Sequence, residues 1–309
     1  MIDVVAVGEI LMDVIATQRD VSLFDAPSFV PFPGGAPANV AVGVQRLGRS
    51  AAFIGKVGRD EFGVGLRDLL QREGVDVRGL RDDPQQLTTV AFVSLSDGGE
   101  PHFAFFAGAH TALRVADLDL AVLYEALIVH GGSVALAHEP VRSATLAAWQ
   151  IAHEHGALCS YDVNWRPMLW PDVAAGLAIA RQPLAFADIV KMNAAELRLL
   201  SGLDDLHAGF LTLATNAALV VVTLGAGGCL YRCQGTIYAQ PAPPVAEIID
   251  TAGAGDAFMA ALLAGLPEHP AQLSVERLAA IMQRACRAGA IAVTRAGAMT
   301  ALPYAHELP

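Results

Sequence analysis

Hydrophobic and polar positions along the chain alternate between a strand pattern and a helix pattern. Short β-rich runs such as VVAVGEI, AAFIGKVG, ALIVHGGSVAL, ALCSYDVNW, DIVKMN and ALVVVTLG indicate buried strands. Between them, PANVAVGVQRLG, GVGLRDLLQREG, SATLAAWQIAHEHG and DAFMAALLAGL repeat apolar residues at helical spacing. This alternation predicts an α/β fold with a mostly parallel, doubly wound sheet flanked by helices. In such folds the loops after the strands carry the chemistry.

Two segments depart from the alternation. Residues 14–32 and 88–108 show period-two strand patterns without an intervening helix, and the second contains a DGGE turn at 97–100. We expect them to form a small β-sheet lid over the strand ends. The alternative is a pair of edge hairpins that do not move. The rest of the chain then makes up the α/β domain, from residues 1–13, 33–87 and 109–309.

Length, charge and the N-terminal sequence narrow the class of protein. The 309 residues are 54% hydrophobic and 17% charged, which suits one large core with a small attached domain. The net charge of −11 opposes binding to nucleic acid and to anionic membranes, so we expect neither as a partner. The N-terminal run MIDVVAVGEI lacks the basic start of a signal peptide and predicts a first core strand.

The cysteines and histidines do not predict a metal centre. Cys159, Cys229, Cys233 and Cys286 are scattered, and we expect reduced core residues of a cytoplasmic protein. The histidines, including both in HEH at 153–155, lack ligand geometry with cysteines or carboxylates. Packing or surface positions are expected for them.

The stretch DTAGAGDAF, residues 250–258, predicts an anion-binding helix start. A helix beginning near Asp256 leaves its first amides unpaired, and Gly253, Ala254 and Gly255 let the backbone approach a ligand. Those amides suit the charge of a transferring phosphoryl group. Asp256 beside them is placed to accept the proton of an attacking hydroxyl.

A simpler interpretation of the same stretch stays open. Asp256 is a common residue type for a helix cap, and the glycines then only turn the chain. A helix N-terminus also lowers the pKa of an aspartate, which weakens it as a base. Positioning contributes more than basicity in phosphoryl transfer, so this objection does not exclude a catalytic role.

DTAGAGDAF resembles the second signature of the PfkB/ribokinase family of sugar kinases, usually DTTGAGD followed by an aromatic residue. PGGAPANVAVGVQRLG followed by FIGKVGRDEFG resembles the first signature, and GEILMDVI, DVNWRP, KMNAAE and VVTLGAGG follow in the family's order. HGGSVALAHEPVRSATL and SYDVNWRPMLWPD look most like the fructokinase branch. The resemblance runs from Gly8 to Pro303 and implies a ribokinase-like fold with a small β-sheet lid.

The resemblance implies a set of sugar-binding residues. The family's G-E-x-x-x-D acid corresponds to Asp13, and its first signature supplies backbone amides and an amide side chain. Two further residues follow the strand ALCSYDV. The implied substrate-binding residues are Asp13, Gly34, Gly35, Asn39, Asn164 and Arg166. Structural alternatives are a polar strand end at Asp13, a helix cap at Asn39 and a surface charge at Arg166.

Ion and nucleotide sites follow from the same resemblance. Asn193 and Glu196 resemble the N-x-x-E element that organises Mg²⁺ through water on the phosphates of ATP. A capping box is the alternative, and both roles are compatible. Asp250, with the loop TRAGAMT, corresponds to a site where some relatives bind a monovalent cation, so K⁺ is a second candidate ion. The implied nucleotide-binding residues are Asn193, Thr223, Gly225, Gly228, Cys286 and Gly289.

The implied function is ATP-dependent phosphorylation of a primary hydroxyl of a sugar, with fructose as the first candidate. An exposed edge of the lid sheet would invite a partner strand, so a homodimer through the lid is a further hypothesis. The signature reads T-A-G where T-T-G is usual, and FAFFAGAHTAL (103–113) stands where fructokinases carry an Arg and an Ala-Asp pair. Kinases for 2-keto-3-deoxygluconate, ribose or a nucleoside are therefore alternatives, as is a non-catalytic sugar or nucleotide sensor. The chain has neither GxxxxGK[ST] nor a G-x-G-x-x-G after its first strand, which argues against Walker-type kinases and nicotinamide dehydrogenases.

Overall fold

The structure is a computed structural model and describes residues 1–94, 102–213, 215–266 and 269–308. Within these residues, two sheets form, with strand orders β13-β12-β11-β10-β9-β8-β1-β4-β5 and β3-β2-β6-β7. The large sheet contains β1 (Ile2–Val7), β4 (Ala51–Gly58), β5 (Leu80–Asp83), β8 (Ala126–Gly132), β9 (Leu158–Asp162), β10 (Ile189–Asn193), β11 (Leu219–Thr223), β12 (Cys229–Cys233) and β13 (Thr236–Gln240). The small sheet contains β2 (Leu11–Ala16), β3 (Phe29–Gly34), β6 (Val90–Ser94) and β7 (His102–Phe106).

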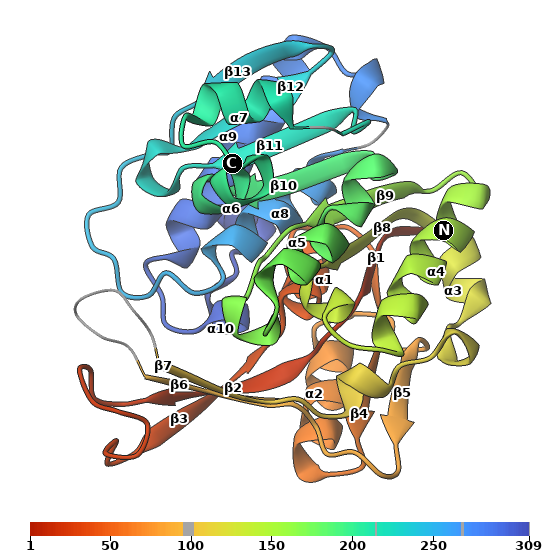
Figure 1. Cartoon of the computed structure of the whole chain (residues 1–309), viewed down its shortest axis with the longest axis vertical. Coiled ribbons are helices and arrows are strands. Elements are labelled where there is room, and N and C mark those ends of the chain that lie inside the picture. Colours follow the sequence, from red (N-terminus) through yellow and green to blue (C-terminus); the bar gives the residue numbers. More distant parts are fainter. Residues whose placement is uncertain (95–101, 214, 267–268, 309) are drawn as a thin grey trace.

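Helices cover both faces of the large sheet (Figure 1). Its strands from β5 to β11 run parallel, and β12 and β13 add an antiparallel edge. Side chains of β1 alternate between two buried clusters, with Val4 and Ala6 in one and Val5 and Val7 in the other. The predicted doubly wound α/β fold is thus confirmed. The helices are α1 (Ala36–Arg46), α2 (Glu61–Arg72), α3 (Leu120–Tyr124), α4 (Val141–Glu154), α5 (Val173–Ala180), α6 (Ala194–Ser201), α7 (Leu206–Thr212), α8 (Ala254–Gly265), α9 (Val275–Ala292) and α10 (Ala298–Ala301).

The small sheet stands apart from the large one, at the lower left of Figure 1. Its first hairpin starts at Leu11 and ends at Gly34, so it is slightly longer than the predicted segment 14–32. β2 pairs in parallel with β6, which joins the two segments into one sheet. The DGGE turn at 97–100 lies outside the described residues. Movement of this sheet as a lid remains a prediction.

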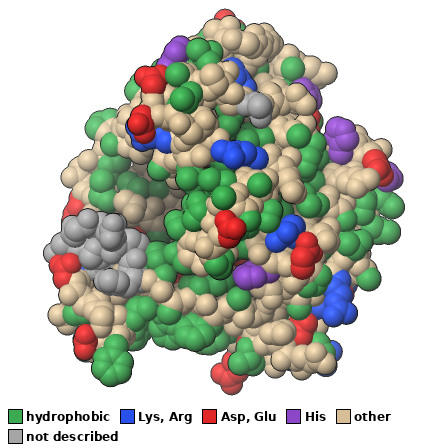
Figure 2. Space-filling model, in the orientation of Figure 1, with side chains coloured by type: hydrophobic (Ala, Val, Ile, Leu, Met, Phe, Trp, Pro, Cys, Tyr) green, Lys and Arg blue, Asp and Glu red, His purple; other side chains and the backbone are tan. Residues whose placement is uncertain are grey.

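The outer surface carries dispersed charge. On the face that Figure 2 shows, Lys and Arg side chains are scattered and do not form a basic patch. Among the described residues, no helix combines the length and the apolar character that crossing a membrane requires. The four cysteines are free and buried.

Candidate active site

A cavity of about 480 Å³ lies between the small sheet and the loops at the carboxyl ends of the large sheet. The molecule is visibly hollowed beside the small sheet, at the left of Figure 2. Both sheets contribute to its wall, as does the turn that precedes α8. The predicted site residues that line it are Asp13, Gly35, Asn39, Arg166, Asp250, Gly253 and Asp256.

The turn into α8 requires glycine. Gly253 is the N-cap residue of α8 and has a left-handed backbone with φ 74°. A Cβ at this position would stand 2.7 Å from the Cα of Ala298, so no larger residue fits. The Ala257 amide makes the first intrahelical bond, 2.8 Å to the Gly253 carbonyl. The preceding amides stand at the open helix end, although that of Ala254 makes a long 3.4 Å contact with the Thr251 carbonyl.

Asp256 is the third residue of α8 and does not cap it. Its Oδ2 accepts a 2.7 Å hydrogen bond from Nδ2 of Asn39, and both side chains are buried. Asn39 lies inside α1, whose N-cap is Gly35. The capping alternatives for Asp256 and Asn39 are therefore wrong: the two residues bond to each other across the cavity floor.

The pKa of Asp256 is raised, which differs from the lowering expected at a helix start. Burial is the main cause, while the Asn39 hydrogen bond and the charge of Lys191 act in the opposite direction. A raised pKa makes the carboxylate a better proton acceptor. Burial thus outweighs the helix dipole at this position.

A buried ion pair lies behind the turn. Lys191 of β10 bonds to Oδ2 of Asp162 at 2.8 Å, with side chains 7% and 3% exposed. The Lys191 ammonium would lie 2.9 Å from a Cβ added to Gly255, so it reaches the glycine turn itself. Burial lowers the pKa of Lys191, but the charges of Asp162 and Glu196 outweigh it and the net pKa is raised. Lys191 therefore stays charged next to the predicted anion hole.

Asn193 and Glu196 form the capping box of α6. Asn193 Oδ1 accepts from the Glu196 amide at 2.9 Å, and Glu196 Oε2 accepts from the Asn193 amide at 2.7 Å. Glu196 Oε1 also accepts from the Trp165 amide at 2.8 Å. The pKa of the buried Glu196 is raised, first by burial and then by Asp162. The capping-box alternative is therefore correct, and it is compatible with the predicted role of these two residues in binding Mg²⁺.

Two further carboxyl groups face the cavity from β2 and the β1–β2 connection. Burial raises the pKa of Asp13 to about 6 and that of Glu9 to about 7, and the nearby Arg166 opposes both shifts. Glu9 Oε1 accepts from the Ala36 amide at 3.3 Å, and its Oε2 has no partner among the described residues. A Cβ at Gly34 would clash with the Asp13 carboxylate, so Gly34 provides room for that group.

The remaining predicted residues lie outside the cavity lining. Thr223 ends β11 beside Asn193, and Gly225 and Gly228 follow it with positive φ of 57° and 90°. Gly289 packs on the start of α8, where a Cβ would stand 3.2 Å from the Ala254 carbonyl. Thr223, Gly225 and Gly228 thus lie at and just after the end of β11, and Gly289 lies against the first turn of α8.

Three other predicted positions have structural contacts. Cys286 on α9 contacts Cys229, with 3.8 Å between the sulfurs. Asn164 has φ 44°, and its carbonyl accepts from Ser133, so its observed contact is a backbone one. Asp250 accepts from the amides of Ala252 and Gly297, each at 2.9 Å, and so ties the turn before α8 to the loop before α10.

Comparison with known proteins identifies the family. The family model for pfkB family carbohydrate kinases matches residues 1–305. The chain belongs to this family. It is 42% identical to fructokinase-1 of Oryza sativa subsp. japonica, over 99% of this chain and 96% of that protein.

Solved carbohydrate kinases share the fold. Fructokinase from Xylella fastidiosa with bound ATP has a TM-score of 0.89 and 32% identity, with 100% of this chain and 97% of that chain covered. Fructokinase from Vibrio cholerae O395, bound to fructose, ADP and a calcium ion, has a TM-score of 0.88 and 33% identity, with 99% and 97% covered. The predictions of the family, the fold class and an ATP-dependent sugar kinase are confirmed.

Sequence reasoning missed three buried ionisable residues of this carbohydrate kinase. Lys191 and Asp162 lie within the strand runs DIVKMN and ALCSYDV, and Glu9 lies in GEILMD. A charge inside an otherwise apolar strand was the available signal, because such groups are rarely buried without a partner. Their partners come from distant parts of the chain, so the pairing itself could not be predicted.

Proposed function

We propose that this kinase transfers the γ-phosphoryl group of ATP to a primary hydroxyl of fructose. The observation that carries the proposal is the buried Asn39–Asp256 pair beside the glycine turn of α8, facing a cavity that also holds Arg166 and Asp13. The pattern of relatives supports fructose as the acceptor, since the rice relative and both solved kinases are named fructokinases.

In the proposed reaction, Asp256 accepts the proton of the sugar hydroxyl as its oxygen bonds to the γ-phosphorus. The bond from the γ-phosphorus to the bridging oxygen breaks, and ADP keeps the electron pair. The backbone amides of Gly253, Ala254 and Gly255 stabilise the charge on the transferring group. Asn39 holds the Asp256 carboxylate in position through their 2.7 Å hydrogen bond.

Residues of both sheets are proposed to position the sugar. Asp13 and Arg166 are proposed to bond sugar hydroxyls inside the cavity, and the backbone at Gly34 and Gly35 is proposed to approach the sugar closely. Asn164 is proposed to act on the sugar from just outside the lining. A rigid bonding frame of this kind fixes the hydroxyl for in-line attack.

Lys191 is proposed as a positioning residue for the anion hole. Its charge lowers the pKa of Asp256, against burial, and adds positive potential behind Gly255. Asp162 keeps the ammonium in place through the 2.8 Å bond. Positive charge held in a dry site stabilises a developing anion more strongly than it would in water.

The nucleotide is proposed to lie against Thr223, Gly225 and Gly228, with Cys286 and Gly289 as the opposite wall. Asn193 and Glu196 fit water-mediated Mg²⁺, because each Glu196 oxygen retains a lone pair beyond its amide bond. The ion would neutralise charge on the phosphates of ATP.

A K⁺ ion beside Asp250 is proposed to order the turn before α8. Replacing K⁺ with a bulky organic cation tests this proposal, because kcat should then fall.

The protein is also proposed to be a cytoplasmic homodimer. Free, buried cysteines support a cytoplasmic location. The small sheet has β3 and β7 at its edges, and Val30 and Phe106 there are 42% and 60% exposed. An exposed edge of this kind invites pairing with a second copy, so we propose a homodimer through the lid. A monomeric mass by light scattering would contradict it.

A coupled ADP-release assay tests the substrate proposal. MgATP is offered with fructose, ribose, 2-keto-3-deoxygluconate, glucose and adenosine in turn. Turnover with fructose alone supports the proposal. Turnover with a different acceptor would assign another substrate but leave the proposed mechanism unchanged. No turnover with any acceptor, together with intact ATP binding, would support a non-catalytic sensor.

A further inference from the structure

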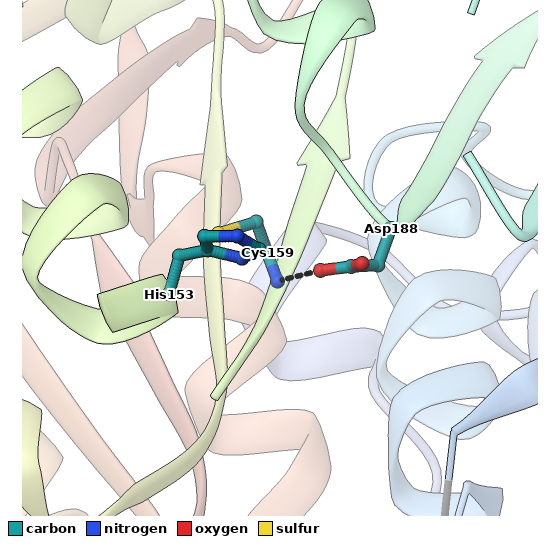
Figure 3. A group of neighbouring side chains, drawn as sticks. All are labelled: His153, Cys159 and Asp188. Carbon is teal, nitrogen blue, oxygen red and sulfur yellow. Dashed lines mark hydrogen bonds between the residues drawn. The ribbon is translucent and has the colours of Figure 1, made fainter. Parts of the chain in front are cut away.

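Three side chains of metal-ligating types lie close together at the amino-terminal ends of β9 and β10, whereas the cavity lies at the carboxyl ends of the strands. His153 lies in the last turn of α4, Cys159 is the second residue of β9, and Asp188 immediately precedes β10 (Figure 3). Their ligand atoms all lie within 4.8 Å of one another. The prediction that His153 lacks ligand geometry with cysteines or carboxylates is therefore wrong. Asn193, at the other end of β10, is about 16 Å away along the strand.

The backbone fixes two members of this cluster against each other. The Cys159 amide donates to Asp188 Oδ2 at 2.7 Å, and the Asp188 amide donates to the Cys159 carbonyl at 2.8 Å. Figure 3 shows the first of these bonds as a dashed line, with the His153 ring beside Cys159. Gly156, with φ 85°, turns the chain from α4 into β9 within a few residues, which brings His153 back over Cys159. The relative positions of Cys159, Asp188 and His153 are thus fixed by the backbone without a bound ion.

The donor set has the chemistry of a zinc site. Imidazole nitrogen, thiolate sulfur and carboxylate oxygen are the three ligand types of Zn²⁺, with bond lengths of about 2.0–2.3 Å. Tetrahedral ligands at such lengths stand about 3.4 Å apart, so a small side-chain rotation closes the cluster around an ion. His153 is exposed, which supplies both an entry path and room for a water ligand. We propose that His153, Cys159 and Asp188 form a Zn²⁺ site, with water as the fourth ligand.

One further side chain lies next to the cluster. On the far side of the carboxylate, Nε2 of His269 lies 3.9 Å from Asp188 Oδ1. This separation is longer than a hydrogen bond, so a small shift of either side chain would be needed before His269 could support Asp188 as an outer-shell donor.

Metal titration with Co²⁺ as the probe tests the proposal. The full chain, freed of metal by a chelator, is titrated with Co²⁺ while its absorption is recorded. The proposal predicts a thiolate-to-cobalt charge-transfer band in the near ultraviolet and the intense visible bands of tetrahedral cobalt. Zn²⁺ should abolish both, and excess Mg²⁺ should leave them unchanged. Absence of a charge-transfer band would overturn the proposal.

Matched variants assign the site. His153→Ala should weaken cobalt binding at least about 100-fold, because loss of a ligand should cost more than loss of an outer-shell partner, which costs about 10- to 100-fold. His155→Ala is the control, since His155 is a nearby exposed histidine that stacks on Tyr124 instead. Equal binding by wild type and His153→Ala would contradict the proposal. His153 is exposed, so this variant should fold normally, and its thermal unfolding without metal should match that of wild type.

A second pair of variants excludes other thiols. Cys159→Ser should lose the charge-transfer band, whereas Cys229→Ser should retain it. Cys229 and Cys286 are the alternative source, because their sulfurs lie 3.8 Å apart. A band that survives Cys159→Ser and disappears in Cys229→Ser would place the metal elsewhere and overturn the assignment.

Discussion

The wall of the cavity formed by the large sheet and its helices carries buried charge, whereas the wall formed by the small sheet is mostly apolar. The first wall presents the buried carboxyl groups of Glu9 and Asp256, the buried amide of Asn39 and the exposed guanidinium of Arg166. The second presents apolar side chains from alternate positions of its strands, namely Ile15, Ala91, Val93, Phe103 and Phe105. Asp13 is the one acid of the small sheet among the described lining residues.

This difference separates two tasks. Buried charges with raised pKa values suit proton removal and phosphoryl transfer, which are the same for every sugar. An apolar sheet suits exclusion of water and selection by shape, which differ from one sugar to another. We therefore expect substitutions in the charged wall to lower kcat, and substitutions in the apolar wall to change KM and acceptor choice.

The largest effect is expected from Asp256→Asn. The amide keeps the shape of the side chain and its position beside Asn39, but it cannot accept the proton, so kcat should fall about a thousandfold. Steady-state kinetics measure the fall, and calorimetric titrations of sugar and of an ATP analogue should show near-normal affinities. Near-normal turnover would leave Asp256 with a structural role only.

Lys191→Met should lower kcat about a hundredfold, because it removes positive charge behind the glycine turn. It also leaves Asp162 buried without its partner, which should reduce the free energy of unfolding by about 3–5 kcal/mol. The acidic limb of the pH profile should move to higher pH, since Lys191 lowers the pKa of Asp256.

Lys56→Met is the matched control for this variant. Lys56 is 11% exposed and pairs with Asp83 and Asp117 outside the cavity lining. It should lose stability while keeping kcat and the pH profile. Equal kinetic losses in the two variants would show that Lys191 acts through stability alone.

Acid should weaken sugar binding through Asp13. Its pKa of about 6, raised by burial, means that KM for the sugar should rise several-fold as pH falls from 7 to 5. Asp13→Asn should have a high KM that no longer varies with pH in this range. A KM that is flat in wild type would remove Asp13 from the binding role.

The same group affects stability with a definite sign. Between pH 3.8, the ordinary value, and about 6, the folded protein holds a proton that the unfolded chain has released. Stability should therefore fall as pH rises through this window. Thermal unfolding of wild type and Asp13→Asn should show a smaller decline in the variant.

The smallest effect is expected on the apolar wall. Phe103→Ala should raise KM for the sugar about threefold and increase ATP hydrolysis without sugar, while kcat changes little. Phe106→Ala is the control, because Phe106 lies on the same strand, is 60% exposed and does not line the cavity. A kcat loss in Phe103→Ala as large as that of Lys191→Met would contradict the claim that the apolar wall affects KM and the charged wall affects kcat.

Local patterns made much of the fold predictable. Apolar runs with β-branched residues marked the strands of the large sheet, and the glycines of DTAGAGD marked the turn before α8, where Gly253 has a positive φ. The segments of the small sheet were visible from their period of two. The helix start was displaced by two residues, from Asp256 to Ala254, because the left-handed cap at Gly253 lies outside any hydrophobic pattern.

The site was less predictable because it depends on contacts between distant residues. Asn39 and Asp256 each suited a helix cap, and only the folded chain brings them together. The raised pKa of Asp256 follows from burial, which a local helix-dipole argument does not include. The His153 cluster likewise joins α4 to the start of β10, a proximity that no spacing in the sequence encodes.

Phosphorus NMR of the reaction product tests the central claim most directly. The charged wall is claimed to transfer phosphoryl to a primary sugar hydroxyl with Asp256 as the base. The account predicts a phosphate ester signal split by two methylene protons when fructose and MgATP are incubated with wild type, and the same signal accumulating about a thousandfold more slowly with Asp256→Asn. Inorganic phosphate as the sole product, or an ester signal split by a single proton, would contradict it.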